Sequence, residues 1–330
     1  MYPLQKTEQN HKRLTIGKYE VDREIGKGGF SNVYLAYHSK TKERVAIKVI
    51  NRKTTLKMDM LNYLENEIRL ISRFDHPNIV KVYDIVYTEE DICIVMEYLP
   101  NGSLQSLIDM DFPFTPIEQV KIATEILEGI NYLHQRGISH RDIKPGNILF
   151  DENMNAKIID FGFSNERNSL LHTFCGTQLF MAPEIISNHS YDGKKADIWA
   201  FGVTAHLFAS KTYPFNISSE VQFVNDVKNK KLDIVVEATG ILGWVIKNSL
   251  LIDPNERLNS SDLLQYVRQH SSFPTQSVTM FLGPKRAKTT CPVPNLKCIP
   301  SSPLLARPRI TNKLVFRGYN IQRRQIRSLE

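Results

Sequence analysis

Residues 140–150 read His-Arg-Asp-Ile-Lys-Pro-Gly-Asn-Ile-Leu-Phe, and residues 160–162 read Asp-Phe-Gly. Both stretches place charged or amide side chains next to apolar runs. The apolar residues after Asn147 and before Asp160 predict two short buried strands, joined by the turn-like residues 151–155. Such a hairpin brings Asn147 and Asp160 to one end of the pair, with Asp142 on the loop before it. We therefore expect three oxygen-bearing side chains to converge on one cleft.

These side chains suit one kind of chemistry. Carboxylate and amide oxygens are ligands for Mg²⁺, which usually takes one or two protein carboxylates and completes its shell with water and phosphate oxygens. A carboxylate beside that metal accepts the proton of an incoming hydroxyl group. Metal, base and little covalent chemistry are the requirements of phosphoryl transfer.

The order of motifs is specific. His-Arg-Asp-x-Lys-Pro-x-Asn is followed by Asp-Phe-Gly and then by Ala-Pro-Glu at residues 182–184. From about Tyr19 to Phe273 the chain resembles a eukaryotic-type serine/threonine protein kinase, most similar to the calcium/calmodulin-dependent and AMP-activated group. The resemblance implies transfer of the γ-phosphate of ATP, with Mg²⁺, to Ser or Thr of protein substrates. A pseudokinase, a scaffold of the same fold without turnover, is the alternative.

The pattern of apolar residues agrees with an α+β, bilobal kinase fold, with strands first and helices second. We expect an N-terminal lobe of antiparallel strands with one helix over about residues 19–100, and a mainly helical C-terminal lobe over about 101–273. An extension (1–18) precedes them and a tail (274–330) follows. The expected strands lie within 19–50, 79–87 and 92–98, and the expected helices at 61–73, 116–134, 197–209, 220–230, 239–250 and 260–270.

The resemblance assigns roles to six residues. Asp142 becomes the catalytic base, Lys144 stabilises the transferring phosphoryl group, and Lys48 holds the α- and β-phosphates. The remaining three are Glu67, the partner of Lys48, and the Mg²⁺ ligands Asn147 and Asp160. In the family, a lysine at the place of Lys144 accompanies Ser or Thr acceptors. Taken singly, each residue also fits an ordinary turn, cap or surface position.

The nucleotide site follows from the same resemblance. Glycines let backbone N–H groups approach phosphate oxygens, but the third glycine of the family's loop is Ser31 here. Met96 matches the gatekeeper position. The residues expected around the nucleotide are Ile25, Gly26, Lys27, Gly28, Gly29, Phe30, Ser31, Val33, Ala46, Lys48, Met96, Glu97, Leu99 and Leu149.

The resemblance also assigns residues to regulation and to a structural ion pair. Thr173 falls at the activating phosphosite of AMP-activated-like kinases, so we expect an upstream kinase, with Arg141 as the partner of the phosphate. Glu184 is expected to form a buried ion pair with Arg257.

Substrate choice is marked by two departures from the family. Basophilic relatives carry glutamates where this chain has Ser103 and Gly146. We therefore do not expect an arginine-directed consensus.

The composition of the chain indicates the compartment in which the protein works. Among 330 residues the four cysteines are too few and too scattered for a disulfide framework, which indicates a reducing compartment. No secretory signal or membrane span is expected, so a cytoplasmic or nuclear location is the natural interpretation.

The charge is uneven along the chain. Residues 273–330 carry eleven Lys or Arg and a single Glu, a charge of +10, so the remainder carries −3. This proline-interrupted tail predicts a largely disordered arm. Alternatively it contacts the kinase body and inhibits it, or binds acidic lipid, nucleic acid or, as a minor option because of Gly318, calmodulin.

Overall fold

The computed structural model describes residues 14–28, 31–53, 64, 68–162, 164, 178–188 and 190–271. All of them lie in the first of the two units into which the chain divides, residues 1–276. Several predictions therefore lie outside the described residues. They concern Gly29, Phe30, Glu67, Thr173 and the tail.

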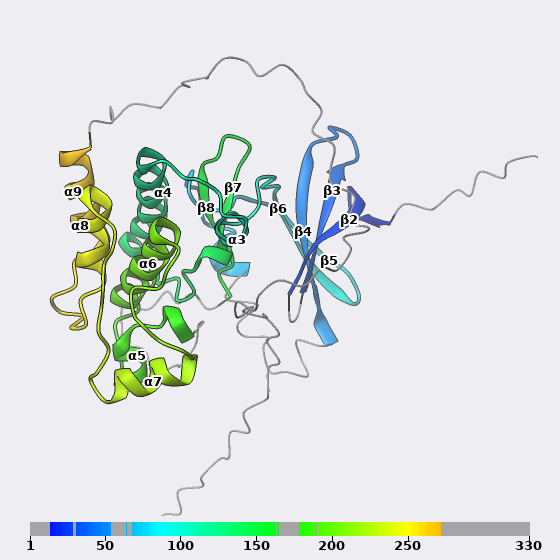
Figure 1. Cartoon of the computed structure of the whole chain (residues 1–330). Coiled ribbons are helices and arrows are strands. Elements are labelled where there is room, and N and C mark those ends of the chain that lie inside the picture. Colours follow the sequence, from blue (N-terminus) through cyan, green and yellow to red (C-terminus); the bar gives the residue numbers. More distant parts are fainter. Residues whose placement is uncertain are drawn as a thin grey trace, which may run out of the picture. The chain divides into compact units, whose positions relative to one another are not determined.

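The N-terminal lobe is built on one antiparallel sheet with the strand order β1-β2-β3-β4-β6-β5. Figure 1 shows its strands in blue and cyan, apart from the green and yellow helices. The expected strands are present, but the one expected at 79–87 begins only at Val82, and Ile79 instead forms an isolated parallel bridge with Ile158. The strands are β1 (Thr15–Ile16), β2 (Tyr19–Lys27), β3 (Ser31–His38), β4 (Arg44–Asn51), β5 (Val82–Tyr87) and β6 (Asp91–Glu97).

The sheet curls, so that its two edge regions meet. Tyr19 at the start of β2 donates a hydrogen bond from its hydroxyl to Asp84 Oδ2 of β5, at 3.4 Å. Lys18 Nζ lies 3.3 Å from the same oxygen. Gly17, at φ 55°, makes the turn between β1 and β2, and a β-carbon there would lie 3.5 Å from Val86. A curled sheet covers its own inner face, and Ala36, Ile47 and Val95 there are fully buried.

The helix predicted for residues 61–73 is described only in part. Leu64 and residues 68–71 are helical. Leu64 packs with Ile50, Ile92 and Ile94 of the sheet, while Ile71 belongs to the core that continues into the C-terminal lobe. The apolar positions of this helix therefore face the sheet and the lobe junction, as the 3.6-residue period predicts.

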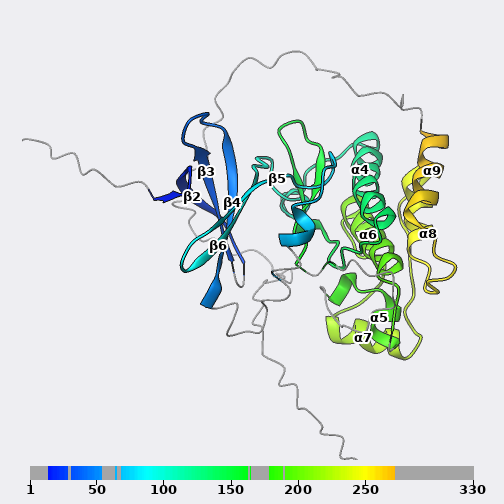
Figure 2. The same cartoon turned by 180° about the vertical axis from the view of Figure 1, so that it is seen from behind.

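The C-terminal lobe is mainly helical, and its helices are seen from the opposite side in Figure 2. Helix α6 is buried nearly all round, with 14 of its 18 residues in the core, which confirms the prediction from its uninterrupted apolar sequence. The elements are α3 (Leu104–Asp109), α4 (Pro116–Gln135), β7 (Ile148–Phe150), β8 (Ala156–Ile158), α5 (Pro183–Ser187), α6 (Gly193–Ser210), α7 (Glu220–Lys228), α8 (Gly240–Ser249) and α9 (Ser260–His270).

Helix α4 shows how the sequence sets a helix. Thr115 caps it by accepting a hydrogen bond from Glu118 N, and the Glu118 carboxylate in turn accepts one from Thr115 N, which is a capping box. Ile122, Ile126 and Leu133 are buried, as their spacing predicts. Ile117 was expected on the same face but is 66% exposed. It lies in the first turn of the helix.

The predicted hairpin is β7–β8, paired antiparallel with Ile148 opposite Ile158. Its second strand runs one residue earlier than expected; beyond it, Ile159 N–H still donates to Asn147 O at 3.0 Å, and the left-handed conformation follows at Asp160. The α+β bilobal architecture predicted from the sequence is confirmed. Among the described residues, no helix combines the length and the apolar character that a membrane crossing requires.

Candidate active site

A cavity of about 650 Å³ lies between the sheet and the β7–β8 hairpin. Of the residues predicted to surround a nucleotide, every one that the structure describes lines it, from Ile25 on β2 to Leu149 on β7. The sequence prediction missed other lining residues. Val80, Ile94 and Ile159 are apolar residues whose place in a wall depends on tertiary packing, although Ile159 directly precedes Asp160 and so carried a signal.

The glycine-rich turn joins β2 to β3 above this cavity. Gly28 N–H donates to Ser31 O at 2.7 Å, which closes the hairpin. A β-carbon at Gly28 would lie 3.2 Å from Ser31 Oγ and 3.3 Å from Ser31 O. The small residues therefore let the backbone itself form the roof of the cavity.

Lys48 reaches across the cavity from the middle of β4. Its Nζ lies 3.3 Å from Asp160 Oδ1, and its side chain is 18% exposed, whereas that of Asp160 is 44% exposed. The Lys48 ammonium holds the pKa of Asp160 below its usual value. Asp160 also adopts φ 65°, a left-handed conformation unusual for a residue other than glycine. The carboxylate is thus ionised and aimed at the cavity by a specific backbone conformation.

Asp142 and its neighbours form a compact polar group. Lys144 Nζ lies 2.7 Å from Asp142 Oδ2. Asn147 Nδ2 donates to the same oxygen and to the Asp142 backbone carbonyl, both at 2.9 Å. Because the amide nitrogen is used in this way, Oδ1 is the atom of Asn147 that remains for a ligand in the cavity. The loop thus holds a carboxylate, an ammonium group and an amide oxygen close to one another.

These observations can be set beside known proteins. A family model described as the protein kinase domain matches residues 19–269. The chain belongs to the protein kinase family. The kinase domain is 33% identical over 252 residues to the carbon catabolite-derepressing protein kinase of Saccharomyces cerevisiae, a match that covers 76% of this chain and 40% of that protein.

Two further relatives agree. The kinase domain is 38% identical over 265 residues to the serine/threonine-protein kinase kin-29 of Caenorhabditis elegans, covering 77% of this chain and 31% of the relative. It is 38% identical over 214 residues to CBL-interacting serine/threonine-protein kinase 19 of Arabidopsis thaliana, covering 63% and 44%. These matches confirm the resemblance to the calcium/calmodulin-dependent and AMP-activated group. The chain spans less than half the length of each of these three relatives.

In this kinase domain Asp197 of α6 fixes the catalytic loop. Its carboxylate, 1% exposed, accepts hydrogen bonds from His140 N at 2.8 Å and Arg141 N at 2.7 Å. His134 Nε2 lies 2.9 Å from Asp197 Oδ2. Arg141 is held at φ 69°. A strained backbone of this kind persists only where its surroundings determine it, and here the buried carboxylate does so.

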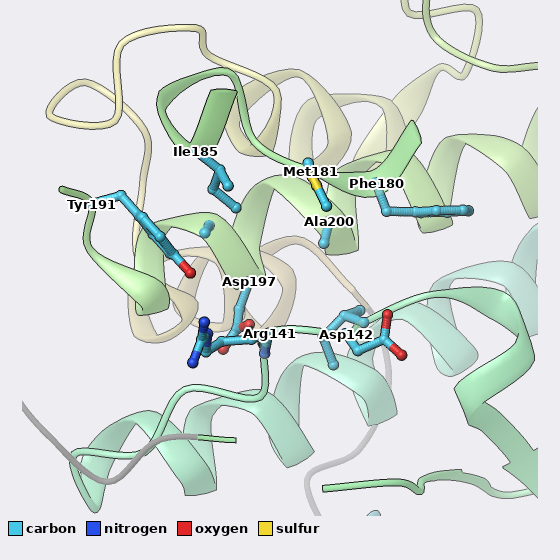
Figure 3. A pocket seen from close by; sticks show the side chains of 10 residues that line it. Arg141, Asp142, Phe180, Met181, Ile185, Tyr191, Asp197 and Ala200 are labelled. Carbon is cyan, nitrogen blue, oxygen red and sulfur yellow. Dashed lines mark hydrogen bonds between the residues drawn. The ribbon is translucent and has the colours of Figure 1, made fainter. Parts of the chain in front are cut away.

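Asp142 and Arg141 line a second, much smaller pocket on the side of the loop facing α6. Figure 3 shows Arg141 near Tyr191, with the Asp142 carboxylate pointing away from Arg141 and Asp197. Asn147 and Asp160 line the large cavity, and Asp142 is joined to it through Asn147. Asp142 thus lies at the boundary between the large cavity and the smaller pocket on the α6 side.

The predicted ion pair between Glu184 and Arg257 is confirmed. The Arg257 guanidinium binds the Glu184 carboxylate at 2.6 and 3.0 Å, and both side chains are buried. It also donates to the carbonyls of Leu251 and Lys195. Glu184 lies in the first turn of α5, shortly after residues 178–180, so this pair fixes the end of the activation segment to the helical core.

Proposed function

We propose that this protein is a serine/threonine kinase that transfers the γ-phosphate of ATP to hydroxyl groups of protein substrates. The observation that carries the proposal is the arrangement of Asp142, Lys144 and Asn147 at the edge of the cavity that Lys48 and Asp160 close. A pseudokinase would need the same fold, but neither the arrangement nor the named relatives, all protein kinases, favours it.

The chain's own residues account for each requirement of the transfer. Asp142 accepts the proton of the incoming hydroxyl group, and its bond to Asn147 orients it. Lys144 lies at 2.7 Å from the base and faces the phosphoryl group in transit, where a fixed cation stabilises developing charge. Lys48, which lines the cavity with its ammonium group 3.3 Å from Asp160, would bind the phosphates of the nucleotide. The apolar walls formed by Val33, Ala46 and Leu149 receive the adenine ring.

The residues present also fit Mg²⁺. Asp160 is ionised and lines the cavity, and Asn147 directs its free amide oxygen there. No cluster of three His, Cys, Asp or Glu side chains able to hold a metal exists in the described part of the chain. One carboxylate and one amide match a cation that completes its shell with phosphate oxygens and water. Bound with ATP, Mg²⁺ supplies charge neutralisation of the phosphates.

Regulation and substrate choice belong to the same proposal. Phosphorylation of Thr173 by an upstream kinase would add a phosphate group that the Arg141 guanidinium can bind. That guanidinium lies 6.0 Å from the centroid of the Tyr191 ring. Ser103 is engaged as the N-cap of α3, where it accepts from Ser106 N. A β-carbon at Gly146 would meet no other atom within 4 Å, so crowding at the β-carbon does not account for the glycine. A substrate without upstream arginine follows from these two residues.

The proposal also covers the basic tail and the cellular location of the protein. The +10 charge of residues 273–330 suits the acidic remainder of the chain, acidic lipid or nucleic acid, and a cytoplasmic or nuclear place suits the four scattered cysteines.

The test is transfer of radiolabelled phosphate from Mg-ATP to a mixed protein substrate, followed by phosphoamino-acid analysis. Label on serine and threonine is expected. Label confined to tyrosine would contradict the acceptor assignment, and transfer that is absent even after phosphorylation at Thr173 would contradict kinase activity. An arrayed peptide screen tests the consensus: strong selection for arginine three residues before the acceptor would refute the argument from Ser103 and Gly146.

A further inference from the structure

Lys157 carries an almost fully buried charge that the proposed phosphate transfer does not use. It lies on β8, the second strand of the β7–β8 hairpin, and its side chain is 11% exposed. A lysine is almost never buried without a partner, because taking an ammonium group out of water is costly. The partner here is Glu97, whose side chain is 16% exposed and whose Oε1 lies 2.9 Å from Lys157 Nζ. The pair joins elements of the two lobes.

Glu97 is held in place before Lys157 reaches it. It is the last residue of β6, from which the chain leaves the N-terminal sheet. Its backbone N–H donates to Lys81 O at 2.9 Å, and its Oε1 accepts a hydrogen bond from Lys81 N at 2.7 Å. The carboxylate oxygen that meets the ammonium group of Lys157 therefore has a fixed orientation relative to the sheet.

On the hairpin, Lys157 is paired directly opposite Leu149 of β7. Residues directly opposite each other in an antiparallel pair point to the same face. Leu149 lines the nucleotide cavity, and Glu97 lines it as well. Lys157 therefore lies on the face of the hairpin that the cavity uses, and its ammonium group reaches the edge of the cavity at Glu97.

The cavity has walls from both elements that this pair joins. Leu149 belongs to the hairpin, and Asn147, whose amide oxygen is directed to the cavity, directly precedes β7. Residues 97–100, which lead from the sheet toward α3, line the cavity too. The contact between Glu97 and Lys157 thus fixes the hairpin relative to the segment that borders the nucleotide site.

Stability alone does not explain a charged pair at this place. The cost of desolvating two charges offsets most of their attraction, so apolar side chains of similar size are often as stable as a buried pair or more so. Separating the two charges, by contrast, leaves each one buried and uncompensated. The two elements are therefore held in the arrangement in which Lys157 meets Glu97.

A second lysine binds the same hairpin without reaching the other lobe. Lys121 of α4 donates to Met154 O and Asn155 Oδ1 in the hairpin turn, both at 3.1 Å. Its ion-pair partner is Glu125, one helical turn further along α4, at 2.7 Å. Lys121 anchors the hairpin to a helix of its own lobe, whereas Lys157 connects it to the N-terminal sheet.

We propose that Lys157 is a positioning residue of the nucleotide site. Through Glu97 it fixes the hairpin that carries Leu149 and Asn147 at the separation from the sheet that the nucleotide requires. Without the pair, the nucleotide itself has to order the two walls, and this cost lowers its affinity. The inference rests on the proposed function, because it takes the large cavity to be the nucleotide site.

The test is direct binding of a fluorescent ADP analogue, with Mg²⁺, to the full chain. Lys157→Met keeps the length of the side chain and removes its charge, and it is expected to raise the Kd roughly tenfold, since preorganisation of the site is lost. Lys157→Arg, which can still pair with a carboxylate, is expected to stay within about threefold of the parent. Equal Kd values for the parent and Lys157→Met would overturn the inference.

Lys121→Met is the matched control, because it loosens the same hairpin and leaves the contact to Glu97 intact. It is expected to lower the midpoint of thermal unfolding, since two acceptors in the hairpin turn lose their donor, but to leave the Kd within about twofold of the parent. If Lys121→Met raised the Kd as much as Lys157→Met, the link to Glu97 would not be what positions the site. That result would overturn the proposal.

A double-mutant cycle tests whether Lys157 acts through Glu97. Glu97→Gln removes the charge and keeps an acceptor for Lys81 N–H. Combined with Lys157→Met, it is expected to give a Kd within about twofold of the weaker-binding single variant, because residues in contact are not additive. A Kd raised by the product of the two single effects would contradict the proposal. Should Lys157→Met fail to fold, Lys157→Gln replaces it in both experiments.

The same proteins separate this inference from the proposed function. A parent that binds no ADP would overturn the proposed function and the inference with it, whereas a parent that binds ADP no better than Lys157→Met would overturn the inference alone. In phosphate transfer, Lys157→Met is expected to raise the KM for ATP while kcat stays within about threefold. A lower kcat with an unchanged KM would indicate loss of folded protein and contradict a positioning role.

Discussion

Replacing Arg257 by alanine removes the most heavily bonded buried cation in the described part of the chain. The guanidinium donates to both carboxylate oxygens of Glu184 and to the carbonyls of Leu251 and Lys195. Its side chain is 0% exposed and that of Glu184 is 3% exposed. In the variant, the Glu184 charge stays buried without its partner, and the carbonyls of Leu251, Lys195 and Ile252 lose this donor. We therefore expect a large loss of stability.

The magnitude follows from the general behaviour of buried pairs. Removing one partner of a buried ion pair costs about 3 to 5 kcal/mol. Domains of this size are stable by about 5 to 15 kcal/mol, and each kcal/mol moves the thermal midpoint by about 2 to 4 °C. The midpoint of Arg257→Ala is thus expected to fall by roughly 6 to 20 °C.

Urea unfolding followed by tryptophan fluorescence is a suitable assay. Trp199 is fully buried, and its ring centroid lies 5.1 Å from the Arg257 guanidinium carbon, so it reports on this site. The matched control is Glu90→Ala, which breaks the Lys53–Glu90 pair, exposed at 74% and 68%. Exposed pairs contribute about 0 to 1 kcal/mol. If both variants lost the same small amount, the scaffold role of the buried pair would be refuted.

Three further predictions concern single residues. Lys48→Met is expected to reduce phosphate transfer by about a hundredfold or more, as for the loss of one fixed charge contact to the reacting group. The control Lys53→Met is expected to leave both phosphate transfer and the thermal midpoint unchanged. If the two variants lost the same amount of transfer activity, the role of Lys48 would be refuted. Burial raises the pKa of Cys93 to about 11 from 9.0, so alkylation of Cys93 at pH 8, mapped by mass spectrometry, is expected to be about a hundredfold slower than that of a free thiol. Alkylation at the rate of a free thiol would contradict the raised pKa. The raised pKa also means that the stability contribution of the protonated thiol is present below pH 9 and is lost as the pH rises toward 11. Gly102→Ala is expected to lower the free energy of unfolding by about 1 to 2 kcal/mol, because Gly102 has φ 74° and an added β-carbon would lie 2.9 Å from Ser106 Oγ. Gly146→Ala, where an added β-carbon has open space around it, is the control. Equal free energies of unfolding for the two variants in urea would contradict the predicted strain at Gly102.

The sequence predicts those parts of the fold that carry a strong local signal. The period of apolar residues identified α4, the nearly uninterrupted apolar sequence identified α6, and the β-branched run from Val45 identified β4. Short elements were not predicted. Helix α3 has six residues and α5 has five, too few for a periodicity to be recognised. Their conformations depend on the caps and on the core beneath them.

The differences at individual residues have tertiary causes. Ile79 belongs to a β-branched run but pairs with Ile158 of the other lobe, which no local pattern indicates. Ile117 follows the helical period, yet nothing in the described part of the chain covers it fully. Asp142 was placed with Asn147 and Asp160 because the hairpin brings them together. The loop is also fixed from the α6 side, where Asp197 accepts a hydrogen bond from the backbone N–H of the left-handed Arg141, and no local pattern indicates this contact.

The most direct test of the central claim compares phosphate transfer by the parent protein and by Asp142→Asn, both phosphorylated at Thr173, at saturating Mg-ATP. Asparagine keeps the size of the side chain and removes the base, so transfer is expected to fall by about two to four powers of ten while nucleotide binding is retained. Transfer that is undiminished in Asp142→Asn, or negligible in the parent, would contradict the account.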